Sequence, residues 1–469
     1  MSNFNWKILM IFVFIFTIKT LFITTGFFWD SVTILSKTAT FLYHTNFSQH
    51  IPSNLDNGDP FILPGYIALV WKLAGRTPIV THLAFLPAII IALIYLLKTI
   101  ELFFERNIST YVFMLLVCEP AFTTQMTGLY QDAFTIALTI TAFYYIITKR
   151  YIAASFFTLT LCLISRRAIL MAFSLIIFQL VQEYITNKNI TKVLKKHFKY
   201  ILPSTLTVLS FIIWRLSVYG WFFTTTGTEY GDHTNLSGII KNTLTFIRWQ
   251  LENGRIAIWS ALIIFVYMMR KRNIKLLVTE MKDVLLAYLI ITIVLISVTI
   301  PLQNPFGARY FIFLYLLLCI ITAKIISTYL PLHKSKKALI ALAIILFTGN
   351  FWKYPDIVAQ PWDCKLSHLG YFNLKTDVID YLNKNNIPLS DVGCGFPMYS
   401  ATADIDINND QEIIHNINLK SNKYVIYSNI FNLPDEEIIE IETWPLIKRF
   451  NDNFVFFEIR MNPKFQYKL

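Results

Sequence analysis

Residues 28–75 read FWDSVTILSKTATFLYHTNFSQHIPSNLDNGDPFILPGYIALVWKLAG and separate the first two strongly apolar segments of the chain. Asp30 and Asp59 flank a polar part of this stretch that we expect to fold as a loop. Asp30 follows Trp29, where the first apolar segment ends and the chain should meet water. Its carboxylate is therefore a candidate catalytic group at the edge of a bilayer. The alternative is that Asp30 caps a helix over Ser31–Tyr43.

The composition of the whole chain indicates a membrane protein. Of its 469 residues, 55% are hydrophobic and 15% are charged. Apolar runs of about 20 residues, each long enough to cross a bilayer, recur from Trp6 to Trp352. The first run, Trp6–Phe28, lacks a signal-peptide cleavage site, so we expect a retained helix. Polar residues become frequent from Lys353 onward, which predicts a membrane domain over 1–352 and a soluble domain over 353–469.

Hydropathy predicts about eleven membrane spans. They cover 6–28, 78–104, 109–125, 131–149, 151–165, 168–184, 200–223, 254–269, 284–302, 309–329 and 338–352. The fifth and sixth come from one apolar run that Arg166-Arg167 interrupts, and one long helix is the alternative.

The distribution of Lys and Arg decides between these alternatives. With a cytoplasmic N-terminus and a split run, basic residues gather in every second connection, as the positive-inside rule requires. The long loop 30–77 and the tail 353–469 then lie outside the cytoplasm. The net charge of +12 follows from these connections, so it predicts contact with anionic membrane lipids and not with nucleic acid.

Two outer segments and the tail have further patterns. Residues 60–75 are apolar but short, which predicts an interfacial helix, and a second outer loop over 224–253 is polar. In the tail we expect a small α/β domain. Its predicted elements are a helix over 374–383, strands over 391–395, 424–428 and 454–461, and a helix or turn over 434–440.

Two of the five cysteines, Cys364 and Cys394, lie in this tail. A disulfide between them is one hypothesis, because the domain is expected in an oxidising compartment. The alternative is that Cys394 is a buried strand residue. The run Asp404-Ile405-Asp406 has the spacing of a metal-binding DxD motif, but it lacks the expected strand context, which favours a surface turn.

Charged residues at the outer ends of the predicted spans are the candidates for chemistry. Asp132 opens the fourth span, where it either caps a helix or serves a site. Arg166 and Arg167 are costly between apolar segments unless they are paired, so we expect them to bind an anion, with snorkelling as the alternative. Arg309 begins the tenth span, where its charge opposes the helix dipole. This predicts a phosphate or carboxylate partner.

The order of these features resembles the GT-C membrane glycosyltransferases, particularly the family 39 group. That group includes protein O-mannosyltransferases and the bacterial enzymes that move aminoarabinose onto lipid A. In the family an acidic pair, usually Asp-Glu, follows the first span. Here Asp30 keeps the first acid, and Ser31 stands where the Glu is expected. Asp59-Pro60 replaces the His-Pro of the family's loop.

The resemblance extends to later parts of the chain. Asp132 matches a second acid that opens the fourth span, and Arg309-Tyr310 matches an Arg-Tyr pair that begins a late span. The tail, with PWDCKLSHLGYFNLKTDVIDYL, is similar to the extracytoplasmic domain of some bacterial members. The resemblance therefore implies a GT-C fold of about eleven helices with a soluble α/β domain at the C-terminus.

The implied activity is the inverting transfer of a sugar from a polyprenyl-phosphate donor to a lipid, glycan or protein acceptor, in the bacterial inner membrane. Asp30 is the implied base, Asp132 a helper and Asp59 a weaker third acid. Four residues are the implied contacts of the donor phosphate: Arg166, Arg167, Arg309 and Tyr310.

Two questions stay open at this point. One is whether a divalent metal ion is a cofactor, in which case Asp30 and Asp132 are its possible ligands. The other is whether the protein is instead a transporter or flippase of an anionic lipid-linked substrate. A transporter should place charges and broken helices near mid-membrane and show pseudo-symmetric halves, which the sequence does not display.

Overall fold

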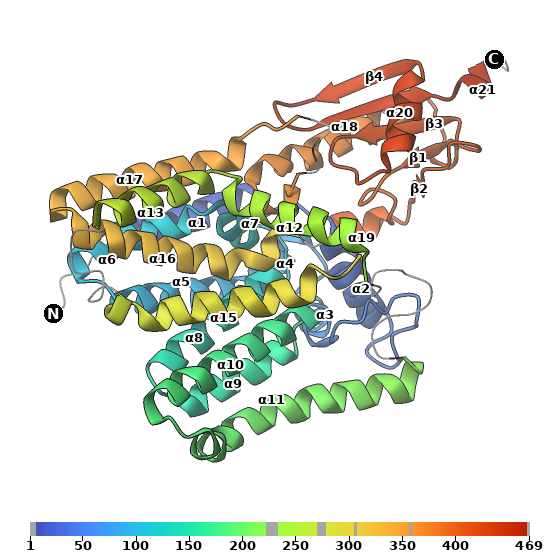
Figure 1. The fold of residues 1–469 in the computed structure, drawn as a ribbon. Helices are drawn as coiled ribbons and strands as arrows, with labels where there is room; N and C mark the ends of the chain where they lie inside the picture. Colours follow the sequence, from blue (N-terminus) through green and yellow to red (C-terminus); the bar gives the residue numbers. More distant parts are fainter. Residues whose placement is uncertain are drawn as a thin grey trace.

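The computed structural model describes residues 6–221, 233–269, 278–303, 307–355, 358 and 360–466. A bundle of helices carries a small sheet domain at one end, and the N-terminus lies at the opposite end of the bundle (Figure 1). The helices of the bundle are α1 (Trp6–Leu21), α4 (Pro78–Ala84), α5 (Leu86–Glu101), α6 (Arg106–Val117), α7 (Pro120–Thr127), α8 (Asp132–Ile147), α9 (Tyr151–Cys162), α10 (Arg166–Asn187), α11 (Ile190–Tyr219), α12 (Leu236–Leu251), α13 (Arg255–Met269), α15 (Lys282–Thr299), η3 (Ala308–Phe311), α16 (Ile312–Tyr329), α17 (Leu332–Thr348) and η4 (Gly349–Phe351).

Each predicted span overlaps at least one of these helices, so the multi-pass helical fold is confirmed. Within the described residues, five segments have the length and apolarity of a full span, and α12 with α13 would be a sixth although the pair is bent by 81°. Other apolar helices, such as α8 and α9, are shorter. The total of about eleven crossings stays a prediction.

The split at Arg166 is confirmed. Helix α9 ends at Cys162, helix α10 begins at Arg166, and the two helices pack against each other. Ser165 caps α10, because its hydroxyl accepts a hydrogen bond from the amide of Ala168 at 3.1 Å. The predicted polar loop 224–253 contains the unpredicted helix α12, and residues 222–232 lie outside the described part.

Burial separates the central helices from the peripheral ones. The span Ala308–Tyr329, formed by η3 and α16, is 83% buried over its most apolar window, whereas Ile190–Tyr219 (α11) is only 11% buried. Because lipid tails are as apolar as leucine, the exposed surface of α11 suits contact with lipid. Helix α16 is therefore the core around which the bundle packs, and η3 leads directly into it.

Buried polar contacts tie the helices together. The ammonium of Lys19 on α1 lies 2.9 Å from Nδ1 of His82 on α4. Arg255 on α13 pairs with Glu119, just before α7, at 2.7 Å. Charged groups inside a membrane protein are expensive unless they are paired in this way.

Basic connections gather at the end of the bundle away from the tail. Lys324, near the end of α16, donates to the carbonyl of Phe103 in the α5–α6 connection at 3.0 Å and pairs with Glu280, just before α15, at 2.9 Å. Lys7, near the N-terminus, donates to the hydroxyl of Tyr111 at the same end (Figure 1). This segregation agrees with the predicted topology, but which end faces the cytoplasm stays a prediction.

The loop between the first two spans is largely helical. It contains the π-helical turn η1 (Val32–Ser36), α2 (Lys37–His44) and α3 (Ile62–Ala74). Helix α3 confirms the predicted helix over 60–75, while its position in the membrane interface stays a prediction.

The tail forms a five-stranded sheet in the order β2-β1-β3-β5-β4, in which β1 is parallel to β2 and β3 and the remaining pairs are antiparallel. Its elements are η5 (Trp362–Cys364), η6 (Leu366–Leu369), α18 (Gly370–Lys384), η7 (Leu389–Asp391), β1 (Val392–Cys394), α19 (Thr402–Asp406), β2 (His415–Asn416), β3 (Tyr424–Ser428), α20 (Asp435–Thr443), β4 (Leu446–Asn451), β5 (Phe456–Met461) and α21 (Pro463–Gln466). The predicted α/β tail is confirmed, whereas β2 and β4 were missed. Strand β4 is mostly exposed, so it lacks the alternation of a half-buried strand.

The tail docks on the loop that follows the first span. The amide of Phe27 donates to the carbonyl of Ile405 at 2.8 Å, and the hydroxyl of Ser36 donates to the carbonyl of Asp404 at 2.6 Å. A Cβ on Gly26 would lie 1.8 Å from the same Ile405 oxygen, so only glycine fits there. The DxD-like run is thus part of an interface between domains.

Two predictions about the tail are settled by these contacts. Residues 404–406 lie in the helix α19 that packs between the domains and not in the surface turn that we expected, and Asp406 pairs with the buried Lys375. The hypothesis of a disulfide is wrong in this structure, because Cys364 and Cys394 are both buried free thiols. They belong to different hydrophobic clusters, Cys364 packing with the membrane helices and Cys394 with the sheet domain.

Candidate functional site

The guanidinium of Arg309, on η3 at the start of the central span, gathers three carboxylates. It donates to Asp30 and to Asp363, and its Nε lies 3.2 Å from Oδ2 of Asp132. The Arg309 side chain is only 5% exposed. Burying a guanidinium is costly unless it is paired on several sides, and here each edge of the fork meets an acid.

Asp30 reaches this cluster through a sharp turn in the chain. Trp29 has φ 51°, a value that a residue with a side chain seldom adopts, and helix geometry begins at Asp30. The hydrogen bonds of the described residues include none from a backbone amide to the Asp30 carboxylate, and Ser31 is the N-cap of η1. The contacts therefore do not support the capping alternative. The side chain is 40% exposed, so it is the accessible acid of the cluster.

Asp132 and Arg167 form the second part of the cluster. Asp132 lies in the first turn of α8, and its Oδ2 also pairs with Arg167 at 3.2 Å. Arg167 lies in the first turn of α10 and its side chain is 22% exposed. The guanidinium carbon of Arg167 lies 4.4 Å from the ring centre of Tyr310, and that of Arg309 lies 5.7 Å from it. The predicted residues Asp30, Asp132, Arg167, Arg309 and Tyr310 are thus brought together.

Asp363 completes the cluster and was missed in the sequence. It lies in η5, within the tail that was predicted to be a separate soluble domain. Its backbone carbonyl accepts a hydrogen bond from Gln125 on α7 at 2.7 Å, which fixes η5 against the membrane helices. The signal in the sequence that could have identified Asp363 is its position next to Trp362 in the segment PWDCKL, residues 361–366.

Asp59 and Arg166 pair with each other beside the cluster. Oδ1 of Asp59 accepts from the amide of Arg166 at 2.9 Å and from its Nε at 3.3 Å. Arg166 also donates to the carbonyl of Asn57 at 2.5 Å. These contacts fasten the long outer loop to the first turn of α10. Asp59 thereby fixes the position of Arg167, the next residue along the helix.

The charges of the cluster favour an ionised Asp30. Burial raises the pKa of Asp30, but the guanidiniums of Arg309 and Arg167 outweigh this and hold its pKa below the usual range. The three carboxylates and two guanidiniums also compensate one another without a bound anion. Of the two anionic partners predicted for Arg309, a phosphate or a carboxylate, the structure supplies carboxylates, those of Asp30, Asp132 and Asp363.

The same geometry does not fit a divalent metal ion between Asp30 and Asp132. The guanidinium of Arg309 lies where a cation bridging these two acids would sit, and its positive charge repels one. Among the described residues, no group of three or more His, Cys, Asp or Glu side chains is arranged to hold a metal ion.

Comparison with known proteins identifies the fold. A scan against protein-family models finds no match, and a search of curated proteins finds none. Among solved structures, ArnT from Cupriavidus metallidurans in the apo state aligns with a TM-score of 0.56 and 8% identity, over 96% of this chain and 97% of that chain. The chain has an ArnT-like GT-C fold.

A second structure agrees. ArnT from the same bacterium bound to undecaprenyl phosphate aligns with a TM-score of 0.54 and 11% identity, over 73% of this chain and 64% of that chain. Both likenesses concern the fold, which confirms the GT-C architecture. Membership of family 39 stays a prediction.

Proposed function

We propose that this protein is a membrane glycosyltransferase that moves a sugar from a polyprenyl-phosphate-linked donor to a lipid, glycan or protein acceptor outside the cytoplasm. The observation that supports it best is the accessible carboxylate of Asp30, fixed by the buried Arg309 at one end of an ArnT-like bundle. One of the two ArnT structures holds undecaprenyl phosphate, which has the chemistry of such a donor's leaving group. The bacterial inner membrane is the compartment that this function implies.

Asp30 is proposed as the general base. Its carboxylate takes the proton from the acceptor hydroxyl or amine as the acceptor atom forms a bond to the anomeric carbon of the sugar. The bond from that carbon to the phosphate oxygen breaks, and polyprenyl phosphate leaves with the electron pair. A single displacement of this kind inverts the configuration at the anomeric carbon. A base that is ionised at neutral pH and held by a guanidinium suits this step.

Arg167 is proposed as the main contact of the leaving phosphate. Its side chain is more exposed than that of Arg309 and has one carboxylate partner instead of three. Its planar fork can hold two phosphate oxygens as negative charge develops on them. The ring of Tyr310 lies beside both guanidiniums, and Asp132 pairs with both of them.

Arg309, Arg166 and Asp59 have supporting parts in this proposal. Arg309 orients Asp30 and lies close enough to add to the positive field at the phosphate, in keeping with the role implied by the family resemblance. Arg166 and Asp59 hold the loop and the start of α10 in place.

The experiment is a transfer assay with the purified protein in nanodiscs. A panel of radiolabelled polyprenyl-phosphate sugars is supplied, and transfer of label to an extracted acceptor fraction is measured. We expect one donor to be consumed by the wild-type protein and by Asp377→Asn, an exposed acid on α18, but not by Asp30→Asn. Movement of intact donor between leaflets without sugar release would instead establish the transporter alternative.

A further inference from the structure

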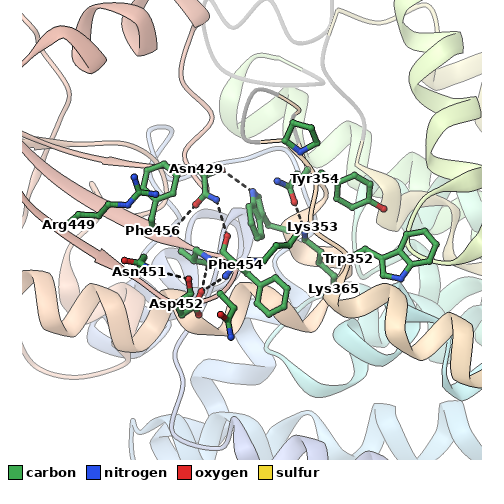
Figure 2. Close-up of a pocket in the computed structure, with 15 residues that line it drawn as sticks. Trp352, Lys353, Tyr354, Lys365, Asn429, Arg449, Asn451, Asp452, Phe454 and Phe456 are labelled. Carbon is green, nitrogen blue, oxygen red and sulfur yellow. Dashed lines mark hydrogen bonds between the residues drawn. The ribbon is translucent and has the colours of Figure 1, made fainter.

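The tail domain encloses a cavity where it meets the end of α17. This cavity of ≈ 340 Å³ opens on the tail side of the segment that follows η4. Figure 2 shows strand residues such as Arg449 and Phe456 on one side of it, and Trp352 and Tyr354 on the other. This volume lies within the range of about 300–1,000 Å³ that is typical of small-molecule sites.

Aromatic rings form much of the wall, and two of them are fixed by their polar edges. The indole nitrogen of Trp362 donates to the carbonyl of Asn429 at 3.1 Å. The hydroxyl of Tyr354 accepts from the amide of Asn253 at 3.0 Å and donates to its side-chain oxygen at 3.2 Å. Trp362 itself is almost fully buried, so the partly exposed rings of Trp352, Tyr354 and Phe454 are the ones that can offer a face to a ligand. A sugar ring has an apolar C–H face that can stack on them and a rim of hydroxyls that needs polar partners.

Lys365 brings a buried positive charge to this cavity. Its side chain is almost fully enclosed, and its ammonium donates to the side-chain oxygen of Gln360. The ammonium lies 4.2 Å from the ring centre of Trp362 and 5.3 Å from that of Tyr354. Over the described part of the chain it makes no ion pair. A buried ammonium in this state gains strongly from an anionic partner.

The ammonium remains mostly charged at neutral pH. Burial lowers the pKa of Lys365 to about 8, and the negative charge of Glu252 acts in the opposite direction. The cavity therefore presents a cation rather than a neutral amine to its ligand.

The other charges of the wall are also mainly positive. Lys353, with its ammonium 5.6 Å from the ring centre of Phe454, lines the cavity, and so does Arg449, which pairs with Glu458 at 2.9 Å. Asp452 is the acid among the described lining residues, and its Oδ1 already accepts the amides of Phe454 at 2.6 Å and Val455 at 2.7 Å. An anionic ligand is therefore favoured over a neutral one.

Amide side chains supply the remaining polar groups. Asn451, the last residue of β4, and Asn453, in the turn to β5, are exposed and line the cavity. Each amide offers both donors and an acceptor, which suits the hydroxyl rim of a saccharide better than a bare phosphate or carboxylate.

We propose that this cavity binds an acidic saccharide, with a sugar ring against the aromatic wall and its carboxylate on Lys365. The site is separate from the Asp–Arg cluster but adjacent to it. Trp362 lines the cavity, whereas Asp363, the next residue of η5, pairs with Arg309. The inference goes beyond the proposed function, because it assigns a binding site and a ligand class that the transfer step does not require.

The test is a binding measurement on the full-length protein in nanodiscs of zwitterionic lipid, with no donor present. Isothermal titration calorimetry compares trigalacturonate, an acidic saccharide, with the neutral maltotriose. We expect trigalacturonate to bind and maltotriose to bind much more weakly. Lys365→Met should weaken trigalacturonate binding by roughly 10- to 100-fold, the effect of losing a charged hydrogen bond. The exposed Lys420→Met is the matched control and should bind as the wild type does.

A second variant, at an exposed position, tests the proposal even if Lys365→Met fails to fold. Lys353 is exposed, so Lys353→Met should fold normally and still weaken binding, although by less than Lys365→Met. Equal binding of the two saccharides, or unchanged affinity in both variants, would overturn the proposal. So would exclusive binding of phosphatidylglycerol, supplied in place of the zwitterionic lipid. Because the assay involves no sugar transfer, any of these failures leaves the proposed function standing.

Discussion

Replacing Arg309 by alanine should destabilise the protein because it leaves buried carboxylates without their partner. The three acids differ in what remains to them. The Asp30 side chain is 40% exposed and can be solvated, and Asp132 keeps Arg167 at 3.2 Å. Asp363 is 9% exposed, and within the described ranges Arg309 is its ion-pair partner. Breaking one buried pair costs about 3–5 kcal/mol, and we expect most of that cost to come from Asp363.

A double-mutant cycle separates this cost from other effects of the substitution. The free energy of unfolding is measured by titration with denaturing detergent for Arg309→Ala, Asp363→Ala and the double variant. If Asp363 is the stranded charge, the double variant should be less destabilised than the sum of the single variants, by roughly 0.5–3 kcal/mol. The control is Arg449→Ala, an ion-paired arginine that is 48% exposed, which should change stability by about 0–1 kcal/mol.

Two results would refute this reasoning. One is an Arg309→Ala protein as stable as Arg449→Ala, which would mean that the three contacts are not formed in the folded protein. The other is strict additivity of Arg309→Ala and Asp363→Ala, which would mean that η5 does not dock as the structure has it. Arg309→Lys should fall between wild type and Arg309→Ala, since a point charge cannot reach three carboxylates as a planar fork does.

The remaining predictions concern the base, the domain interface and the topology. Asp30→Asn should fold and bind donor, but its turnover should fall by roughly 10²–10⁴, the usual contribution of a general base; near-normal turnover would move the search to Asp132. Because the Asp30 pKa is lowered on folding, its contribution to stability should be present above the unfolded value of about 3.9 and be lost as the pH falls through the lower folded value. The loss of activity on acidification should likewise occur below about pH 4. A loss near pH 6 would contradict the lowering of the Asp30 pKa by Arg309 and Arg167. Gly26→Ala should loosen the tail, because its Cβ would meet the carbonyl of Ile405, and limited proteolysis should then release the tail sooner than in wild type. Reporter fusions after Lys337 and Lys353 should report opposite sides of the membrane, and the same side for both would refute the predicted topology.

Much of the fold could be predicted because a bilayer restricts the backbone. A chain crossing lipid must satisfy its own hydrogen bonds, so long apolar runs become helices whatever surrounds them. This is why the predicted span 131–149 matches α8 and why the break before Arg166 was found, the latter from the balance of basic connections. Helix α12 was missed because its apolar residues are spaced along one face within a stretch that reads as polar overall. Strand β4 was missed because it is mostly exposed, so its sequence does not alternate between apolar and polar residues.

The sequence by itself determined the membrane helices, the α/β tail and most of the charged residues at the outer ends of the spans, since those depend on local composition. Only the tertiary structure decided which charges meet. Asp30, Asp132, Arg309 and Asp363 come from four distant segments, and their pairing depends on how α8, η3 and η5 pack. The Asp59 carboxylate lies outside this cluster and accepts a hydrogen bond from the amide of Arg166. The physical reason is that an ion pair acts over a few ångströms in space, whereas local sequence patterns carry no record of which distant segments approach so closely.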